Sequence, residues 1–191
     1  MTHAHTALSR RLSYVLRHNP ASVGIELDEA GWVDINVLLD ALAAAGMTVT
    51  RVELERVVRD SDKQRFALDN QTNRIRANQG HSLPVELGLS PVVPPSVLYH
   101  GTTSRSLASI ATQGLTRGDR HHVHLSPDEA TAQRVGARRG LPIVLAIAAA
   151  AMHADGHAFY LSANGVWLTE AVPPGYLTRD GEPLTRWAPS E

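Results

Sequence analysis

The segment YVLRHNP, residues 14–20, puts a guanidinium and an imidazole side by side at the end of an apolar run. Arg17 is a permanent cation, and the His18 imidazole has the chemistry to bind an anion or to transfer a proton. Basic residues are also common in the last turn of a helix, whose end carries partial negative charge, and Pro20 would stop a helix in any case. The segment by itself therefore leaves an active-site pair and an ordinary helix end open.

The segment YHGT, residues 99–102, combines residue types that could hold a ligand at the end of a strand. Gly101 would let a ligand approach the backbone, and the Thr102 hydroxyl could hydrogen-bond to it. A strand that simply ends in a turn would have the same pattern. The sequence leaves both possibilities open. The neighbouring His100 is a further candidate ligand-binding residue.

The segment HHVHLS, residues 121–126, is richer in imidazoles. His122 and His124 alternate onto one face of a predicted strand, while His121 points the other way. His-x-His on a strand is a spacing found in zinc sites, but the chain has no cysteine and no acidic residue is obviously placed as a third ligand. The sequence therefore favours a site without metal.

Three arginines, Arg65, Arg74 and Arg76, lie in or next to a predicted hairpin. A guanidinium matches the geometry of a phosphate and stays charged at any working pH, so these residues could form a phosphate-binding face. They could equally form a solvated hairpin surface. The arginines alone do not decide between these interpretations.

The composition is that of a globular protein of one large or two small domains. The chain has 191 residues, of which 43% are hydrophobic and 19% charged, and its formal net charge is -1. A polyanion must therefore be bound by a local cluster, and Arg10, Arg11 and Arg17 form one near the N-terminus. The absence of cysteine excludes disulfides and thiol chemistry. The longest apolar stretch, residues 142–152, is too short to span a bilayer, and we expect a cytoplasmic protein.

The first half of the sequence predicts three helices and a β-hairpin. Apolar spacing predicts a helix over residues 6–18, and Asp34 and Gly46 are a plausible cap and terminator for a second over residues 34–45. Thr50 and Glu53 form a capping-box pattern at the start of a third helix that ends near Arg59. The alternating runs around residues 69–73 predict the hairpin. These elements make up a winged-helix-like module.

A Pro- and Ser-rich stretch, residues 82–96, separates this module from a strand-rich α+β half. Strands are expected at VLYHGT, HHVHL and PIVLAI, and a hairpin around the Asn-Gly pair in AFYLSANGVWLTE. Helices are expected at SLASIATQG, closed by Gly114, and after Ser126 as cap with Pro127 at its first position. The alanine run at residues 148–151 could be helical rather than part of a strand.

Taken together, six segments resemble the RNA 2′-phosphotransferase family, which removes the 2′-phosphate left at a splice junction in tRNA. They are LSYVLRHNP, DKQRF, IRANQGHS, LYHGT, HHVHLS and NGVWLT, in order along nearly the whole chain. The resemblance implies an α+β protein with an N-terminal winged-helix-like lobe for RNA and phosphate, residues 1–90. It implies a C-terminal, β-rich, ADP-ribosyltransferase-like lobe for NAD, residues 91–191.

The activity that this resemblance implies has two steps and uses NAD as co-substrate, without a metal. An internal RNA 2′-phosphate displaces nicotinamide to give RNA-2′-phospho-ADP-ribose. The ribose 2″-hydroxyl then attacks the phosphate, releasing 2′-OH RNA and ADP-ribose 1″,2″-cyclic phosphate. The expected partner is a tRNA-like RNA carrying a 2′-phosphate, with no membrane partner, and the expected state is a monomer.

The resemblance also implies roles for individual residues. The positions that grip the phosphate and serve the second step match Arg17, His18, Arg65 and Arg120. The positions that hold NAD match His100, Gly101, Thr102, His124 and Ser126 on the nicotinamide side, and Gly114 and Leu115 near the adenosine half. Fixed guanidiniums would stabilise charge on a transferring phosphate. Whether His18 transfers a proton or only binds the phosphate stays open.

One departure from the wider superfamily concerns a glutamate that assists transfer in most ADP-ribosyltransferases. Val166 stands where that acid aligns, and the nearby Glu170 is no clear substitute. A nucleophile that is already an anionic phosphate needs no carboxylate base and would be repelled by one.

Two other functions remain open from the sequence. An ADP-ribosyltransferase acting on terminal phosphates of nucleic acid or on protein would perform only the first step. A winged-helix nucleic-acid-binding protein with an NAD-sensing second lobe would need basic groups on its third helix. There Arg51, Arg56 and Arg59 are offset by neighbouring acids, which disfavours duplex binding.

Overall fold

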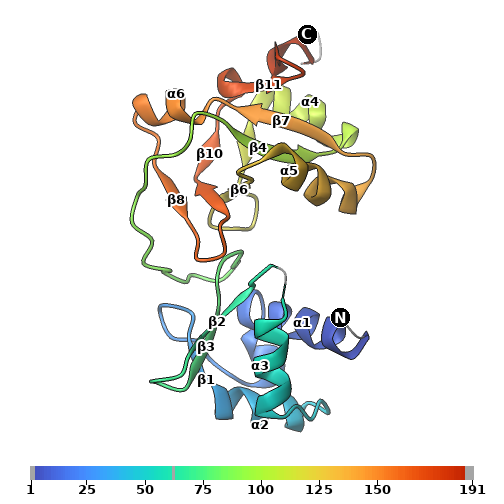
Figure 1. Cartoon of the computed structure of the whole chain (residues 1–191), viewed down its shortest axis with the longest axis vertical. Helices are drawn as coiled ribbons and strands as arrows, with labels where there is room; N and C mark the ends of the chain where they lie inside the picture. Colours follow the sequence, from blue (N-terminus) through green and yellow to red (C-terminus); the bar gives the residue numbers. More distant parts are fainter. Residues whose placement is uncertain (1–2, 62, 188–191) are drawn as a thin grey trace. The chain divides into compact units, whose positions relative to one another are not determined.

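The computed structural model describes residues 3–61 and 63–187. The chain divides into two compact units between Gly88 and Leu89, and each has its own hydrophobic core (Figure 1). Both units mix helices with antiparallel sheets, so the molecule is an α+β protein.

The helices of the first unit are those expected from the sequence. They are α1 (His3–Arg17), α2 (Ile35–Ala44) and α3 (Arg51–Arg59), with a short 3-10 turn η1 (Pro20–Val23). The Asp34 side chain caps α2 by accepting hydrogen bonds from the backbone of the second and third helical residues, and Thr50 and Glu53 form the predicted capping box of α3. Gly46 follows α2 with a φ of +83°. The predicted caps and terminator are therefore confirmed.

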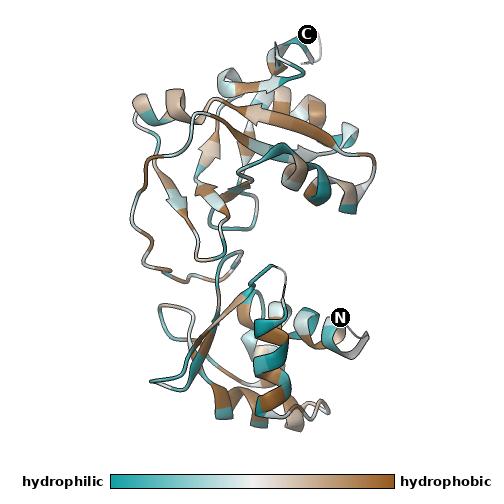
Figure 2. Ribbon diagram, in the orientation of Figure 1, coloured by the Kyte–Doolittle hydropathy of each residue, from teal (hydrophilic) through white to brown (hydrophobic). Residues whose placement is uncertain are grey.

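The sheet of the first unit contains the predicted hairpin and one strand that the sequence did not reveal. Its strands are β2 (Phe66–Asp69), β3 (Arg74–Ala77) and β1 (Val33–Asp34), in the order β1-β3-β2. Buried side chains of α1, α2, α3 and this sheet form one core, which includes Leu12, Leu38, Leu54 and Ile75. Figure 2 shows α3 alternating between hydrophilic and hydrophobic residues, as expected for a helix with one buried face.

The second unit is built from three small antiparallel sheets. The sheet strands are β4 (Leu98–Thr102), β5 (Leu115–Thr116), β6 (Val123–Leu125), β7 (Ile143–Ile147), β8 (Phe159–Leu161), β9 (Trp167–Thr169), β10 (Ala171–Val172), β11 (Leu177–Arg179) and β12 (Glu182–Pro183). The strand orders are β12-β11-β7-β4, β6-β9-β8 and β10-β5. An isolated bridge between Tyr99 and Ser126 joins β4 to the end of β6. The Asn-Gly hairpin is confirmed as β8 and β9, with Gly165 at a φ of +76°.

The helices of the second unit lie where the sequence predicts them, but the first two begin at other residues than expected. They are α4 (Ser104–Gln113), α5 (Glu129–Gly136) and α6 (Ala149–Ala154), with 3-10 turns η2 (Ala137–Arg139), η3 (Pro174–Tyr176) and η4 (Leu184–Trp187). The alanine run is helical, which confirms the alternative that it forms a helix rather than part of a strand. The prediction that Ser126 caps α5 is wrong. Asp128 is the cap, because its carboxylate accepts from the Thr131 amide at 2.7 Å while the Ser126 backbone pairs with Tyr99.

Helix α5 packs directly against β4 at Gly101. A Cβ at this glycine would lie 1.9 Å from the Ala132 carbonyl oxygen, so no larger residue fits without moving the helix. Neighbouring strand residues point to opposite faces, and His100 and Thr102 therefore lie on the face away from α5. Within the residues that the model describes, no helix is long and apolar enough to cross a membrane.

Candidate active site

The first unit gathers Arg17, His18 and Arg65 into what we call the arginine–histidine cluster. Arg17 is the last residue of α1, and its Nη2 donates to the Arg65 carbonyl at 3.4 Å. The Arg65 Nη1 lies 3.5 Å from the Ser9 hydroxyl of α1 and 3.4 Å from the Ser61 hydroxyl. Both hydroxyls are buried, with exposed fractions of 7% and 3%. Each of these hydrogen bonds goes to a neutral oxygen, so none of them neutralises a guanidinium.

The imidazole of the cluster is oriented by a serine. His18 Nδ1 lies 3.0 Å from the Ser82 hydroxyl, and the Ser82 amide donates to the Arg17 carbonyl at 3.0 Å. The His18 side chain is exposed, whereas the chain on either side of it is fixed by the end of α1 and by η1. These contacts would hold the imidazole ring in a fixed orientation when a ligand binds to it.

The backbone before Arg65 is held in an unusual conformation. Gln64 has a φ of +41°, in the left-handed region, and its carbonyl accepts from the Asn78 side-chain amide at 2.5 Å. The Asn78 backbone amide donates to the Arg65 carbonyl at 2.9 Å. The buried Asn78 thus fixes the direction in which Arg65 leaves the chain. Asn78, Ser82, Ser9 and Ser61 were not identified as site residues from the sequence, although the first two lie in the segment IRANQGHS.

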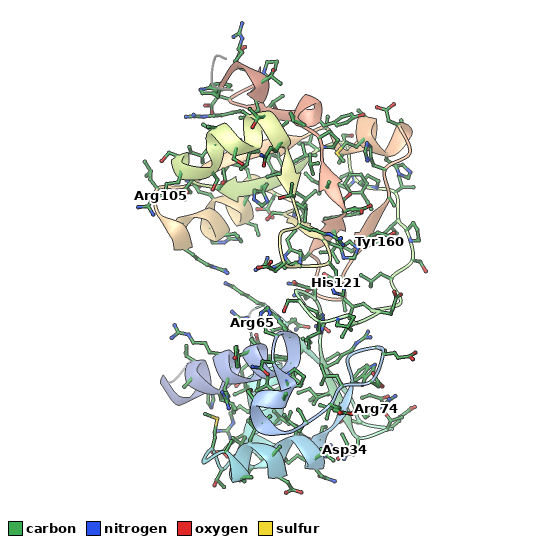
Figure 3. The ribbon with its side chains drawn as sticks, turned by 180° about the vertical axis from the view of Figure 1, so that it is seen from behind. Asp34, Arg65, Arg74, Arg105, His121 and Tyr160 are labelled. Carbon is green, nitrogen blue, oxygen red and sulfur yellow. The ribbon has the colours of Figure 1, made fainter. Side chains whose placement is uncertain are left out.

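The other two arginines of the hairpin have different surroundings. Arg74 donates to Asp28 at 2.9 Å, and its guanidinium lies 5.5 Å from the Trp32 ring centroid. The Arg76 guanidinium lies 4.7 Å from the same centroid, and its Nη1 lies 3.4 Å from the Ala30 carbonyl. Partial burial lowers the Arg76 pKa. Figure 3 shows Arg74 and Asp34 on the same side of the first unit. These contacts give Arg74 and Arg76 a structural role in the sheet.

In the second unit, β4 and β6 gather what we call the strand-edge cluster. It consists of His100, Gly101, Thr102, Arg120, His124 and Ser126. His100 Nδ1 lies 3.1 Å from the His124 carbonyl oxygen, and Arg120 Nη1 lies 2.7 Å from His124 Nδ1. The Tyr99 and Ser126 backbones exchange hydrogen bonds of 2.9 and 2.7 Å. Two histidines that lie 24 residues apart in the sequence are in this way brought to one strand edge.

These contacts fix the role of one ring nitrogen in each of two histidines. A carbonyl oxygen only accepts, so Nδ1 of His100 carries a proton. A guanidinium only donates, so Nδ1 of His124 is the acceptor and its proton is on Nε2. The His124 imidazole is therefore neutral in this arrangement, and the positive charge of the pair belongs to Arg120.

His122 lies beside Tyr160 on the outer face of the β6-β9-β8 sheet. Their ring centroids are 5.3 Å apart, and Tyr160 is in the same register row as His124. The side chains of Val123 and Leu125 point into the core, which agrees with the prediction that His122 and His124 share the other face. Burial, and then the nearby His121 and Arg117, lower the pKa of His122, so its ring favours the neutral form. Figure 3 shows His121 and Tyr160 in the same part of this unit.

Gly114 and Leu115 are separated from this group by the sheet topology. They lead into β5, which pairs with β10 rather than with β4 or β6. A Cβ at Gly114 would lie 2.1 Å from the Val172 carbonyl oxygen, and the Leu115 side chain is 4% exposed within the core. Packing therefore accounts for both residue types.

The structure thus brings most of the predicted residues together as two groups, one in each unit, whereas Gly114 and Leu115 lie outside both groups. Three of the four phosphate residues lie in the first unit, and Arg120 lies with the predicted NAD residues of the second. Among the described residues, no three His, Asp or Glu side chains lie close enough to form a metal site.

Sequence comparison gives independent information on the class of protein. Residues 3–171 match the family described as "RNA 2'-phosphotransferase, Tpt1 / KptA family". A protein of Nostoc punctiforme is 55% identical over 90% of this chain and 95% of its own length, and one of Streptomyces coelicolor is 55% identical over 89% and 92%. A protein of Burkholderia pseudomallei is 52% identical over 92% of this chain and 96% of its own length. Each is named "Probable RNA 2'-phosphotransferase".

Such matches over nearly the whole chain define its class, which is that of the transferases. More narrowly, the chain belongs to the RNA 2′-phosphotransferase, Tpt1 / KptA family. The resemblance inferred from the six sequence segments is therefore confirmed.

Proposed function

We propose that this protein is an NAD-dependent RNA 2′-phosphotransferase that moves an internal RNA 2′-phosphate, such as one at a tRNA splice junction, to NAD. The observation that carries the proposal is the arginine–histidine cluster, in which two guanidiniums and an imidazole gather around hydroxyls and carbonyls. Arginine forks match phosphate oxygens and need no reorganisation when charge develops on them. The family membership supports the same substrate.

We interpret the two units as binding different substrates, one RNA and the other NAD. In the first unit, three helices followed by a hairpin and joined by β1 form a module that we interpret as winged-helix-like. The second unit, with its antiparallel sheets meeting at Tyr99 and Ser126, is interpreted as ADP-ribosyltransferase-like. On this interpretation the first binds the RNA phosphate and the second binds NAD.

The strand-edge cluster offers hydrogen-bonding groups that could hold NAD. The part-exposed His100 and His124 offer imidazoles, and the part-exposed Ser126 hydroxyl could bond a ribose or an amide, whereas Thr102 is buried. Arg120 adds a permanent positive charge beside His124. Gly114 and Leu115, assigned to the adenosine half, could contribute only backbone groups, because Leu115 is in the core.

In the first step a 2′-phosphate oxygen of the RNA forms a bond to C1″ of the ribose, and the C1″–N bond breaks. The electron pair of that bond neutralises the pyridinium, so nicotinamide leaves as a neutral molecule and no proton has to move. This balance explains why a carboxylate base is unnecessary. Val166, at the position of the superfamily glutamate, is bound through its backbone to Ser162 and offers no acid.

In the second step the ribose 2″-oxygen bonds to phosphorus, and the bond from phosphorus to the RNA 2′-oxygen breaks. The 2″-hydroxyl loses a proton and the RNA 2′-oxygen gains one, which leaves ADP-ribose 1″,2″-cyclic phosphate and 2′-OH RNA. Arg17 and Arg65 would stabilise the charge on the equatorial oxygens. His18, held by Ser82, is the candidate for moving the proton.

His18→Ala separates the two roles proposed for this histidine. If His18 transfers the proton of the second step, RNA-2′-phospho-ADP-ribose should form and persist. If it only binds phosphate, both steps should slow together. Unchanged rates of both steps would exclude His18 from the mechanism.

The function itself is tested by incubating the protein with NAD⁺ and a 2′-phosphorylated oligoribonucleotide, followed by mass analysis of RNA and small products. We expect dephosphorylated RNA, nicotinamide and the cyclic phosphate in equal amounts. An otherwise identical RNA with only a 5′-terminal phosphate is the control. ADP-ribosylation of that control without cyclic phosphate would instead favour an ADP-ribosyltransferase, and binding without any product would overturn the assignment as an enzyme.

A further inference from the structure

The outer face of α1 carries, besides His18 just after the helix, residues that the proposed reaction does not use. One side of this helix is buried through Leu8, Leu12, Val15 and Leu16. The opposite side, which we call the α1 outer face, consists of Ala7, Arg10, Arg11 and Tyr14, with His18 just after the helix. Each of these residues lies three or four positions from another member. Tyr14 is 44% exposed, which is unusual for a large aromatic ring on a helix of a small unit.

The charge on this face is of one sign. Its ionisable groups besides Tyr14 are Arg10, Arg11 and His18, and no acidic residue occurs in the chain before Glu26. By contrast, the exposed Arg56 and Arg59 of α3 share their helix with Glu53 and Glu55. A polyanion would therefore be attracted to α1 more than to α3.

The Tyr14 ring is fixed by its neighbours. Its hydroxyl accepts from the Asn19 side-chain amide at 3.1 Å, and the Asn19 side-chain oxygen accepts from the Ser22 amide at 3.0 Å. The Arg11 guanidinium lies 6.0 Å from the ring centroid. Aromatic rings and guanidinium planes are the surfaces on which unpaired bases stack in RNA-binding proteins. Because the ring is already ordered, stacking a base on it costs little side-chain entropy.

The position of the ring relates it to the phosphate residues. The His18 amide donates to the Tyr14 carbonyl at 3.0 Å, so helical geometry continues to His18. Side chains four residues apart on a helix have their Cβ atoms about 5–6 Å apart. A group bound at Tyr14 would thus lie within about one nucleotide of a phosphate bound by His18.

We propose that the α1 outer face binds single-stranded RNA beside the reacting phosphate, with the base of the adjacent nucleotide stacked on Tyr14 and a backbone phosphate on Arg10 and Arg11. This inference rests on the proposed function, because it takes the 2′-phosphate at His18 as its starting point. It adds a substrate class, an RNA in which the nucleotide next to the phosphorylated one is unpaired. The protein should bind such an RNA in preference to a duplex or a mononucleotide.

The first test compares Tyr14→Ala, Tyr14→Phe and wild-type protein on a 2′-phosphorylated oligoribonucleotide and on a 2′-phosphorylated mononucleotide. Loss of a stacked base should raise KM for the oligonucleotide by about fivefold to a hundredfold, with kcat and the mononucleotide KM little changed. Tyr14→Phe keeps the ring without the Asn19 bond and should stay close to wild type.

A second substrate makes the test specific to the stacked base. Oligonucleotides with an abasic residue on the 5′ or on the 3′ side of the phosphorylated nucleotide lack one neighbouring base each. With the abasic RNA on the correct side, wild type and Tyr14→Ala should have the same KM. Equal KM values for wild type and Tyr14→Ala on the intact oligonucleotide, while both turn it over, would overturn the inference and leave the proposed function standing.

The arginines are tested through salt dependence. Binding of a single strand weakens with salt in proportion to the number of phosphates that the protein neutralises, and each phosphate adds about 0.7 to the slope of log K against log salt. Arg10→Ala/Arg11→Ala should therefore lower the slope for oligonucleotide binding, whereas the matched double variant Arg56→Ala/Arg59→Ala on α3 should not. A lower slope in the α3 variant alone would move the RNA surface to that helix. Failure of wild-type protein to process any 2′-phosphorylated RNA would instead contradict the proposed function.

Discussion

Arg65 is held by hydrogen bonds at both its guanidinium and its carbonyl. Its guanidinium donates hydrogen bonds to the hydroxyls of Ser9 and Ser61. Its carbonyl oxygen accepts hydrogen bonds from the Arg17 side chain and from the Asn78 backbone amide. Hydroxyls orient a cation without cancelling its charge, which is the arrangement expected of a group that must stabilise an external anion. A salt-bridged arginine, such as Arg74 beside Asp28, lacks this property.

We predict that Arg65→Ala loses turnover of 2′-phosphorylated RNA by about tenfold to a hundredfold or more, as expected when an electrostatic stabiliser of the transition state is removed. Arg65→Lys should recover only part of the loss, because an ammonium cannot bind two oxygens in a fork. Single-turnover kinetics measure both variants. Arg74→Ala, in the same hairpin, is the control and should retain normal rates. Normal turnover in Arg65→Ala would exclude Arg65 from the reaction.

At the scale of elements, the contact between β4 and α5 positions the strand-edge cluster. The glycine of YHGT was interpreted as a point where a ligand approaches the backbone. The structure gives a different reason for it, because the missing Cβ is what lets the Ala132 carbonyl reach the strand. His100 and Thr102 then face away from the helix, where His100 is part-exposed and Thr102 is buried.

Gly101→Ala is therefore expected to destabilise the protein by about 3 kcal/mol, the upper end of the usual cost of overpacking, because the clash is with backbone and cannot be relieved by a rotamer change. Thermal unfolding followed by circular dichroism gives the measurement. Gly175→Ala is a matched control, since its Cβ would meet nothing within 4 Å. A melting temperature of Gly101→Ala equal to that of the control would contradict the close packing of α5 on β4.

The cap of α5 gives a pH-dependent prediction. The Thr131 amide and hydroxyl, by hydrogen-bonding to the carboxylate, lower the pKa of Asp128 in the folded protein. The stability that this cap contributes is present above the ordinary carboxyl pKa of about 3.9 and is lost as pH falls through the lowered folded pKa. Asp128→Asn keeps an acceptor but does not titrate.

Urea unfolding midpoints at pH 7 and near pH 3 should show this difference. Wild type should lose more stability on acidification than Asp128→Asn, while Asp128→Ala should be less stable than both at pH 7. Equal acid sensitivity of wild type and Asp128→Asn would show that the Asp128 carboxylate is not responsible.

At the scale of the whole molecule, residues 3–61 and 63–187 form two hydrophobic cores with no residue in common. One is formed by α1, α2, α3 and the β1-β3-β2 sheet, and the other by the sheets and helices of the second unit. A cavity in one core therefore removes contacts only within its own unit.

We predict that Leu38→Ala costs about 2–5 kcal/mol and that the loss falls on the first unit. Native-state hydrogen exchange should show reduced protection of amides in α1, α2 and α3, with those of β4 and β7 much less affected. Leu145→Ala, in the other core, should give the reverse pattern. Equal loss of protection in both units from either variant would mean that the cores unfold as one.

The sequence alone determined the features that depend on neighbouring residues. The caps at Asp34 and Thr50, the glycine after α2 and the two hairpins follow from local backbone chemistry, and periodicity located the buried faces of the helices. The family could also be recognised, because its segments keep their order along the chain. The start of α5 was misplaced because two nearby residue types, Ser126 and Asp128, can both cap a helix locally.

Only the tertiary structure decided whether Ser126 or Asp128 caps α5. The Ser126 backbone pairs with Tyr99, which lies 27 residues away in the sequence. The same is true of β1, which is too short to show a pattern and exists because β3 pairs with it. Ser9 and Ser82 became site residues through contacts with Arg65 and His18 across long stretches of chain, and Asn78 through its backbone bond to Arg65 across the hairpin. Helix caps and turns depend on interactions between residues close together in the sequence. The orientation of a functional side chain depends on the residues that the fold packs beside it.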